Sequence, residues 1–312
     1  MALDVACLGI LVADMVAKPV LEIPPPGQLR LVDEMGLHLG GCAGNTAVGL
    51  RRLGVRSGVL GKVGADALGA FIRNALEAEG VDIAGVIVDA QTATSGTVAL
   101  VGPEGERGFL HTFGGNGALR AADVRLEGTG PAPLLHIGGA GLMPAFDGAP
   151  LAEVCRRAQA LGMKVSLDTA WDPLGRWHNV RPVLPYLDYF LPSLEEAQRI
   201  MGVDTAEEIA DLALEQGPSV VVVKMGGQGC YVRSRGEPGR FLSALAVEAV
   251  DTTGAGDAFC AGFLAGVSHA WPVERCALLG NAVAALSVRV PGAVEGVRPW
   301  AETIAVMEAG AI

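Results

Sequence analysis

The stretch Asp251-Thr252-Thr253-Gly254-Ala255-Gly256-Asp257-Ala258-Phe259 joins two apolar runs, and it decides how the sequence is interpreted. The run before it, residues 245–250, predicts a strand, and the run after it, residues 258–269, predicts a helix. Two glycines at the junction remove β-carbons where strand becomes helix, so the backbone can approach a ligand closely. The N–H groups at a helix start lack intrahelical partners, and they make a ready site for an anion.

Asp257 places a carboxylate in the same turn as these donors. A carboxylate beside unpaired N–H groups suggests a general base next to an oxyanion hole. This pairing suits deprotonation of a substrate hydroxyl, while the amides of Gly254, Ala255 and Gly256 stabilise charge on a phosphoryl group in transit. The alternative is a glycine-rich turn in which Asp257 only caps the helix, and the turn by itself does not decide between the two.

Two glycine-rich segments together resemble the signatures of a known family. Residues 251–259 resemble the C-terminal signature of the PfkB (ribokinase-like) carbohydrate kinases, and Gly40-Gly41-Cys42-Ala43-Gly44-Asn45-Thr46-Ala47 resembles their N-terminal signature. The two stand in the expected order, and the resemblance covers nearly the whole chain. It implies a ribokinase-like α/β fold, a three-layer αβα domain with a mainly parallel central sheet. It also implies a single kinase domain over residues 1–312, with a small β-sheet lid inserted from about 12–39 and 94–114.

Composition agrees with one large α/β domain and excludes several other classes. Of 312 residues, 50% are hydrophobic and 18% charged, which allows a sizeable core. The net charge of −11 argues against a nucleic-acid partner and leaves no basic patch for a membrane. Six scattered cysteines without a C-x-x-C pattern predict reduced thiols rather than disulfides or a zinc site. With no signal peptide and no membrane-spanning run, we expect a cytoplasmic protein.

Two aspartates follow predicted strands, where an open parallel sheet binds its ligands. Asp14 comes just after a strand over residues 4–10, and Asp168 ends a strand over residues 164–167. In the family an aspartate after the first strand holds sugar hydroxyls, and Asp14 matches it. Both residues are therefore expected to contact substrate, and a solvated loop aspartate is the alternative for Asp14.

The N-terminal signature and one later strand supply further substrate candidates. Gly40 and Gly41 let the backbone approach a sugar, and Asn45 can donate and accept hydrogen bonds toward vicinal hydroxyls. The alternative is that Asn45 caps a helix over residues 45–53. Strand alternation places Arg107 on one face of its strand with residues 109 and 111. If that face looks into the cleft, Arg107 contacts an acidic or phosphorylated substrate; a solvated arginine is the alternative. Arg107 and Arg176 give a weak indication of a sugar acid.

The nucleotide side of the site rests on the resemblance. Residues 219–223 predict a buried strand, and a glycine-rich loop follows from Lys224. Relatives use this loop to contact the phosphates of ATP, which implies cofactor roles for Lys224, Gly226 and Gly229. Thr253 is assigned to the cofactor as well, and Asn281, on a helix predicted over residues 273–289, matches a position of the family's nucleotide pocket.

The spacing of Ser193 and Glu196 predicts a capping box at a helix start. The family has Asn-x-x-Glu here, near the water shell of Mg²⁺, so Glu196 matches while Ser193 replaces the asparagine. The resemblance implies Mg²⁺ held by ATP and water with no direct protein ligand. A monovalent cation such as K⁺, which relatives can bind near Asp251 and Thr253, is left open.

These observations predict an ATP-dependent kinase that phosphorylates a hydroxyl of a small sugar. A nucleoside kinase of the same superfamily is the first alternative. A nicotinamide-dependent oxidoreductase would need G-x-G-x-x-G after a strand, with an acidic residue about 20 positions later, and the sequence lacks that pattern. The intact Asp257 speaks against a non-catalytic sugar-sensing relative. The lid of relatives often forms a homodimer, which is left open here, and the sequence does not name the sugar.

Overall fold

A large, mainly parallel sheet forms the centre of the molecule in the computed structural model, which describes residues 3–104, 106–126 and 132–311. In those residues nine strands have the order β13-β12-β11-β10-β9-β8-β1-β4-β5. All neighbours from β11 to β5 are parallel, and β12 and β13 add an antiparallel edge. The strands are β1 (Val5–Gly9), β4 (Ser57–Gly64), β5 (Asp82–Asp89), β8 (Leu134–Ala140), β9 (Lys164–Thr169), β10 (Tyr189–Phe190), β11 (Val220–Lys224), β12 (Cys230–Ser234) and β13 (Arg240–Leu242).

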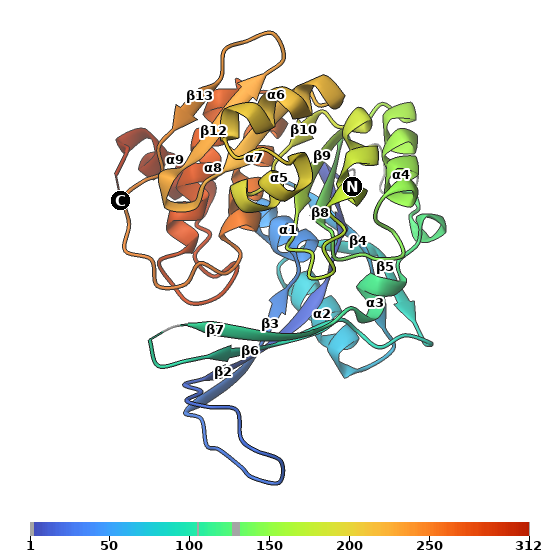
Figure 1. Cartoon of the computed structure of the whole chain (residues 1–312), viewed down its shortest axis with the longest axis vertical. Coiled ribbons are helices and arrows are strands. Elements are labelled where there is room, and N and C mark those ends of the chain that lie inside the picture. The colour runs from blue at the N-terminus through green and yellow to red at the C-terminus, as the bar shows by residue number, and fades with distance from the viewer. Residues whose placement is uncertain (1–2, 105, 127–131, 312) are drawn as a thin grey trace.

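Helices cover both faces of this sheet, as Figure 1 shows, which confirms the predicted three-layer α/β fold. One layer holds α1 (Cys42–Arg52), α2 (Ala67–Ala78), α7 (Ala255–Ser268), α8 (Val273–Ser287) and α9 (Trp300–Ala309). The other holds α4 (Ala149–Ala160), η3 (Trp177–Tyr186), α5 (Leu194–Met201) and α6 (Ala206–Gln216). The valine run of β11 shows why the sequence folds this way: alternate valines enter opposite core clusters, as expected for a parallel strand buried on both faces.

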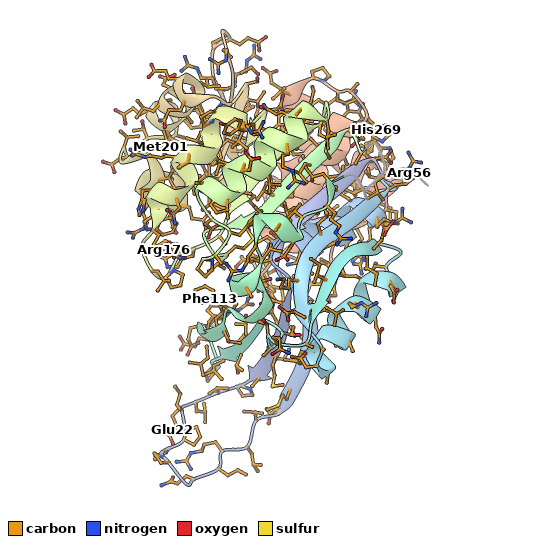
Figure 2. The ribbon with its side chains drawn as sticks, turned by 90° about the vertical axis from the view of Figure 1, so that its right-hand side faces the viewer. Glu22, Arg56, Phe113, Arg176, Met201 and His269 are labelled. Atoms are coloured by element: carbon orange, nitrogen blue, oxygen red, sulfur yellow. The ribbon has the colours of Figure 1, made fainter. Side chains whose placement is uncertain are left out.

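A second, four-stranded sheet projects from the body (Figure 1), which confirms the small separate sheet that the resemblance implied. Its strands, in the order β3-β2-β6-β7, are β2 (Val12–Lys18), β3 (Glu34–Gly40), β6 (Gly96–Val101) and β7 (Arg107–Thr112). The segment 19–33 between β2 and β3, here called the arm, extends away from the body, and Glu22 lies near its end (Figure 2). Short turns complete the chain: α3 (Gly114–Ala118), η1 (Ala121–Asp123) and η4 (Gly226–Gln228).

The two faces of the small sheet differ in polarity. One set of residues that pair across all four strands is apolar. We call it the apolar row, and it consists of Leu37, Met15, Val98 and Leu110. The neighbouring set, one residue along each strand, is the polar row: His38, Asp14, Thr97 and His111. Because successive side chains point to opposite faces, the two rows lie on opposite sides of the sheet. Arg107 shares the face of the polar row and contacts the body at Asp251, so the polar face is turned toward the body.

Two local predictions are wrong. Residues 245–250 form no strand, and the segment contacts the end of α8 instead: the N–H of Val250 donates to the carbonyl of Val288 at 2.7 Å. Helix α1 begins at Cys42 rather than at residue 45. Its N-cap is Gly41, at φ 90°, so Asn45 lies inside the helix and does not cap it. The six cysteines are free, as predicted.

Replacement of a fully buried ring should destabilise this fold far more than replacement of an exposed one. Phe263 of α7 is 0% exposed and contacts the ring of Tyr189 edge-on at 5.6 Å, whereas Phe109 of the small sheet is 62% exposed. We expect Phe263→Ala to lower the free energy of unfolding by about 3–5 kcal/mol, since it leaves a cavity in the core. Phe109→Ala should change it by less than about 0.5 kcal/mol. Denaturant unfolding of both variants checks this, and similar losses would contradict it.

Candidate active site

Helix α7 begins at a glycine that no other residue could replace without strain. Gly254, the N-cap, has φ 70°, in the left-handed region. A β-carbon there would lie 2.5 Å from the carbonyl oxygen of Ala293. Of the amides that the sequence assigned to an anion hole, that of Ala255 donates to the carbonyl of Thr252 at 3.2 Å. This turn sets the direction of α7 and places Asp257 in its first turn.

Asp257 is buried, and its carboxylate contacts helix α1. The Nδ2 of Asn45 donates to its Oδ2 at 2.8 Å. Helix α1 can lie this close because β8 has a glycine at 138, where a β-carbon would be 2.7 Å from the backbone nitrogen of Ala43. Burial raises the pKa of Asp257, although the hydrogen bond from Asn45 and the charge of Lys224 oppose the rise. A carboxylate with a raised pKa is a stronger base than an exposed one.

A buried ion pair lies beside this carboxylate. The ammonium of Lys224, at the end of β11, lies 2.6 Å from the Oδ2 of Asp168 in β9, and the thiol of Cys260 donates to the same oxygen at 3.3 Å. Burial raises the pKa of Asp168 to about 6, although the charge of Lys224 opposes the rise. Burial also acts to lower the pKa of Lys224, but the negative charge of Asp168 outweighs it and keeps the amine protonated.

Gly256 shows how close the ion pair comes to helix α7. A β-carbon on Gly256 would lie 3.0 Å from the Nζ of Lys224 and 4.0 Å from the Oδ2 of Asp168. Any larger side chain at this position would therefore displace the ammonium. The first turn of α7 thus brings together a buried carboxylate, Asp257, and a buried cation, Lys224, from elements far apart in the sequence.

Asp14 and Gly40 lie together where the small sheet meets the body. A β-carbon on Gly40 would be 1.9 Å from the Oδ2 of Asp14, so the carboxylate covers the glycine. Burial raises the pKa of Asp14; a hydrogen bond from Thr97 opposes the rise, and the negative charge of Asp257 adds to it. The charge of one aspartate is therefore felt by the other, as expected if Asp14 and Asp257 face a common site. Gly41, in contrast, packs against β1–β2, where its β-carbon would meet the carbonyl of Ile10 at 2.4 Å.

Arg107 is neither solvated nor free in this structure. Its guanidinium forms an ion pair with Asp251 at 2.6 Å and also donates to the hydroxyl of Thr253. Asp251 accepts further hydrogen bonds from the amides of Thr253 at 2.7 Å and Gly292 at 3.0 Å. The contact connects the small sheet to the loop before α7, and we call it the Arg107–Asp251 latch.

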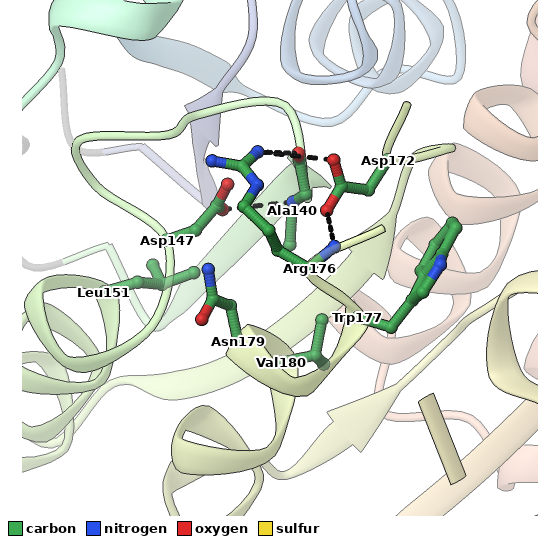
Figure 3. A pocket seen from close by; sticks show the side chains of 9 residues that line it. Ala140, Asp147, Leu151, Asp172, Arg176, Trp177, Asn179 and Val180 are labelled. Atoms are coloured by element: carbon green, nitrogen blue, oxygen red, sulfur yellow. Dashed lines mark hydrogen bonds and ion pairs between the residues drawn. The ribbon is translucent and has the colours of Figure 1, made fainter. Parts of the chain in front are cut away.

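Arg176 is engaged as well, in a small pocket between the loops that follow β8 and β9 (Figure 3). It contacts Asp172 at 3.3 Å and the carbonyl of Gly141 at 3.1 Å. The carboxylate of Asp147 lies in the same pocket and accepts from the amide of Gly141. Both arginines pair with carboxylates of the protein, and the indication of a sugar acid stays a prediction.

The residues assigned to the nucleotide meet at a second segment, residues 242–244. Gly229, at φ 97°, ends the loop after β11, and a β-carbon there would be 2.0 Å from the carbonyl of Leu242. Asn281 of α8 donates to the carbonyls of Leu242 and Ser243, both at 3.2 Å. Gly226 begins the turn of the same loop, two residues after Lys224. Segment 242–244 is therefore contacted both by α8 and by the loop after β11. That loop begins next to Lys224.

The predicted capping box at Ser193 and Glu196 is wrong. Ser193 is the N-cap of α5, but its side chain makes no capping hydrogen bond. The Oε2 of Glu196 accepts instead from the hydroxyl of Thr169 at 2.6 Å, and Thr169 directly follows Asp168. Among the described residues no cluster of three histidine, cysteine or acidic side chains is arranged to bind a metal. A metal beside Glu196 would therefore need ligands from another molecule, which fits phosphate oxygens. Sequence reasoning missed Thr169, whose only signal is its place after Asp168.

Comparison with known proteins identifies the family. The model of the pfkB family carbohydrate kinases matches residues 2–300, so the chain belongs to this family and is a carbohydrate kinase rather than an oxidoreductase. It is 32% identical over 293 residues to the 2-dehydro-3-deoxygluconokinase of Bacillus subtilis (strain 168), covering 89% of each chain. It is also 32% identical over 288 residues to a fructokinase of Klebsiella pneumoniae, covering 88% of this chain and 92% of the relative.

Solved structures agree on the ribokinase-like fold. A putative ribokinase II from E. coli, in complex with ATP and Mg²⁺, superposes with a TM-score of 0.85 at 25% identity and covers 99% of this chain and 100% of its own. Arabidopsis thaliana ribokinase, complexed with ribose and ATP, gives 0.86 at 23% identity and covers 99% of both chains. No helix in the described part of this chain is long and apolar enough to cross a membrane.

The latch should give the protein an acid-sensitive contribution to stability. Burial raises the pKa of Asp251, but hydrogen bonds from Gly292, Thr253 and Arg107 outweigh it and lower the pKa to about 2. A depressed pKa contributes stability that is present above the unfolded value, near 4, and is lost as the pH falls toward 2. We expect the difference in unfolding free energy between wild type and Asp251→Asn to shrink over that range. Denaturant unfolding from pH 6 to 2.5 measures it, and a constant difference would contradict the assignment.

Proposed function

We propose that this carbohydrate kinase transfers the γ-phosphoryl group of ATP to a hydroxyl of a small sugar, with Asp257 as general base. The observation that supports this most strongly is the position of Asp257. Its buried carboxylate lies in the first turn of α7, hydrogen-bonded to Asn45 and close to the cation of Lys224. A base and a positive charge at one helix start are what removal of a proton and stabilisation of a phosphoryl group require.

Each part of the chain has a defined task in this proposal. Asp257 accepts the proton of the attacking hydroxyl, and the amides of Gly254 and Gly256, at the positive end of α7, stabilise the transferring group. Asn45 orients the carboxylate of Asp257 through its Nδ2, while its buried Oδ1 lacks a partner among the described residues. An acceptor left in this way fits a hydroxyl group of the substrate. Asp14 of β2 and Gly40 of β3, where the small sheet meets the body, would complete the sugar site.

The nucleotide would lie along the loop after β11. Gly226 and Gly229 let the backbone approach phosphates, and Asn281 with segment 242–244 would border the base. Mg²⁺ bound to the nucleotide would neutralise phosphate charge, with Glu196 nearby. The small sheet would act as a lid that excludes water, since water competes with the sugar as phosphoryl acceptor. Thr253, through the latch, connects this lid to the start of α7.

The acceptor and the base can be tested together. We expect ADP release from Mg-ATP with one member of a panel of ribose, fructose, 2-dehydro-3-deoxygluconate, tagatose 6-phosphate, adenosine and inosine. Asp257→Asn should lose about 10²–10⁴-fold in kcat, because the hydroxyl keeps its proton. ATP affinity, measured by calorimetry, should be unchanged. Asp204→Asn, at an exposed position, is the matched control and should retain full activity.

Three results of this assay would change the proposal. Turnover near the wild-type level in Asp257→Asn would remove Asp257 as the base. Turnover with a nucleoside alone would favour the nucleoside kinase alternative, and absence of ATP binding would exclude ATP as donor.

The panel is run in K⁺ and in Na⁺ salts. Because the guanidinium of Arg107 already neutralises Asp251, we expect the same rate in both, and a strict K⁺ requirement would restore the cation site that relatives can have.

We also propose that the protein forms a homodimer through the outer face of the small sheet. Within the apolar row, Met15 and Leu37 are each 37% exposed and Leu110 is 61% exposed, and Met35 on the same face is 64% exposed. A sheet that exposes apolar side chains on the face turned away from the body fits a protein interface, and a second copy would cover each such face.

Leu110→Glu should therefore shift the protein from dimer to monomer in sedimentation or light scattering, because it places a charge in the buried centre of the interface. Leu161→Glu is the matched control, since Leu161 is 53% exposed at the end of α4, away from this face. The control should leave the mass unchanged. A wild-type protein that is monomeric at all concentrations would contradict the proposal.

A further inference from the structure

Both carboxylate oxygens of Asp168 already accept hydrogen bonds from within the protein. Its Oδ1 accepts from the amide of Thr169 at 2.8 Å, while its Oδ2 accepts from Lys224 at 2.6 Å and from the thiol of Cys260 at 3.3 Å. The residue is 2% exposed. A carboxylate that is buried and bonded on both oxygens is suited to hold another group in place.

Lys224, in contrast, retains donors. An ammonium has three protons, and Asp168 occupies one of them at hydrogen-bond distance, with Cys260 more distant at 3.9 Å. The nitrogen lies 3.0 Å from the position of a β-carbon on Gly256. An anion that approached the first turn of α7 would therefore meet this ammonium as well as the backbone amides.

We propose that Asp168 is a positioning residue, which fixes the ammonium of Lys224 against the first turn of α7, and that Lys224 stabilises the phosphoryl group during its transfer. This rests on the proposed function and deepens it. In this proposal Asp168 belongs to the phosphate side of the site rather than to the sugar side. Lys224 acts on the phosphoryl group during its transfer rather than only on the bound nucleotide.

The charge of Lys224 depends on its partner. The groups whose charges act with or on it are Asp168 of β9, Asp257 and Cys260 of α7, Glu196 of α5, Cys42 of α1 and His136 of β8. His136 is buried and neutral, since burial and the charge of Lys224 lower its pKa to about 3. No member of this set is a second cation, and Asp168 makes the closest contact. Without Asp168, burial would lower the pKa of Lys224, and the amine would lose its proton at alkaline pH.

The test compares Asp168→Asn, Lys224→Met, Lys224→Arg and the double variant Asp168→Asn/Lys224→Met in full-length protein. A second buried lysine with a carboxylate partner supplies the matched control: the Nζ of Lys62 lies 2.6 Å from Asp123, and Lys62 is 6% exposed. Asp123→Asn removes the nearest carboxylate from a buried lysine outside the site. For each protein kcat and both KM values are measured from pH 6 to 10, with Mg-ATP and the acceptor that the panel identifies, together with the melting temperature.

We expect Lys224→Met to lower kcat about 10²-fold at all pH values, as removal of one donor to a developing charge does. Asp168→Asn should lose about tenfold near pH 7 and more as the pH rises, with the KM of the acceptor unchanged. The double variant should be no slower than Lys224→Met, because Asp168 acts through Lys224. Lys224→Arg should recover part of the rate at every pH, and Asp123→Asn should keep the wild-type pH profile.

Other outcomes overturn the proposal. If Asp168→Asn raises the KM of the acceptor and kcat does not fall at alkaline pH, Asp168 binds the sugar instead. If the losses in kcat of the two single variants add in the double variant, the two residues act independently. If Asp168→Asn does not fold, equal rates for Lys224→Arg and Lys224→Met would show that the positive charge has no role. Failure of the proposed function can be told apart from failure of this inference, because the wild-type enzyme would then release no ADP with any acceptor.

Discussion

The ion pair between Lys224 and Asp168 is the contact on which the arrangement of the site depends. It joins the ends of β11 and β9, the strands on either side of β10, at the point where helix α7 begins. Removal of two charges from water costs several kcal/mol each, so such a pair persists only where the geometry and further hydrogen bonds compensate. Here Cys260 and the amide of Thr169 complete the bonding of Asp168, and Gly256 leaves room for the ammonium. The same arrangement keeps a positive charge within the protein at the position where the proposed reaction brings a negative one.

The large sheet and the small sheet have different roles around this ion pair. The large sheet and its helices hold Asp257, Lys224 and the loop after β11 in fixed positions, because these residues belong to elements packed into the two buried cores. The small sheet projects from the body (Figure 1), and its polar face carries Asp14 toward the site. Its apolar face is open to a partner. One four-stranded element thereby serves the substrate on one side and, in our proposal, a second copy on the other.

The sequence was sufficient for the fold, but not for the contacts within the candidate site. Alternating strand and helix patterns and two glycine-rich signatures predicted the three layers and the small sheet. The pairing of Lys224 with Asp168 joins residues 56 positions apart, and no local pattern reports such a contact. Ser193 and Glu196 have the spacing of a capping box, yet the hydroxyl of Thr169 binds Glu196 instead, because tertiary contacts override a local preference. Residues 245–250 have the composition of a strand, but the end of this segment pairs with the end of α8 rather than with the sheet.

The latch has a consequence for how a ligand enters. Arg107 binds Asp251 and Thr253, so the small sheet is attached to the loop before α7. An acceptor that must pass between them can enter only those molecules in which this contact is broken. The apparent affinity for the acceptor is then the intrinsic affinity reduced by the fraction of open molecules. For such an acceptor, a stronger ion pair between Arg107 and Asp251 would mean a lower apparent affinity.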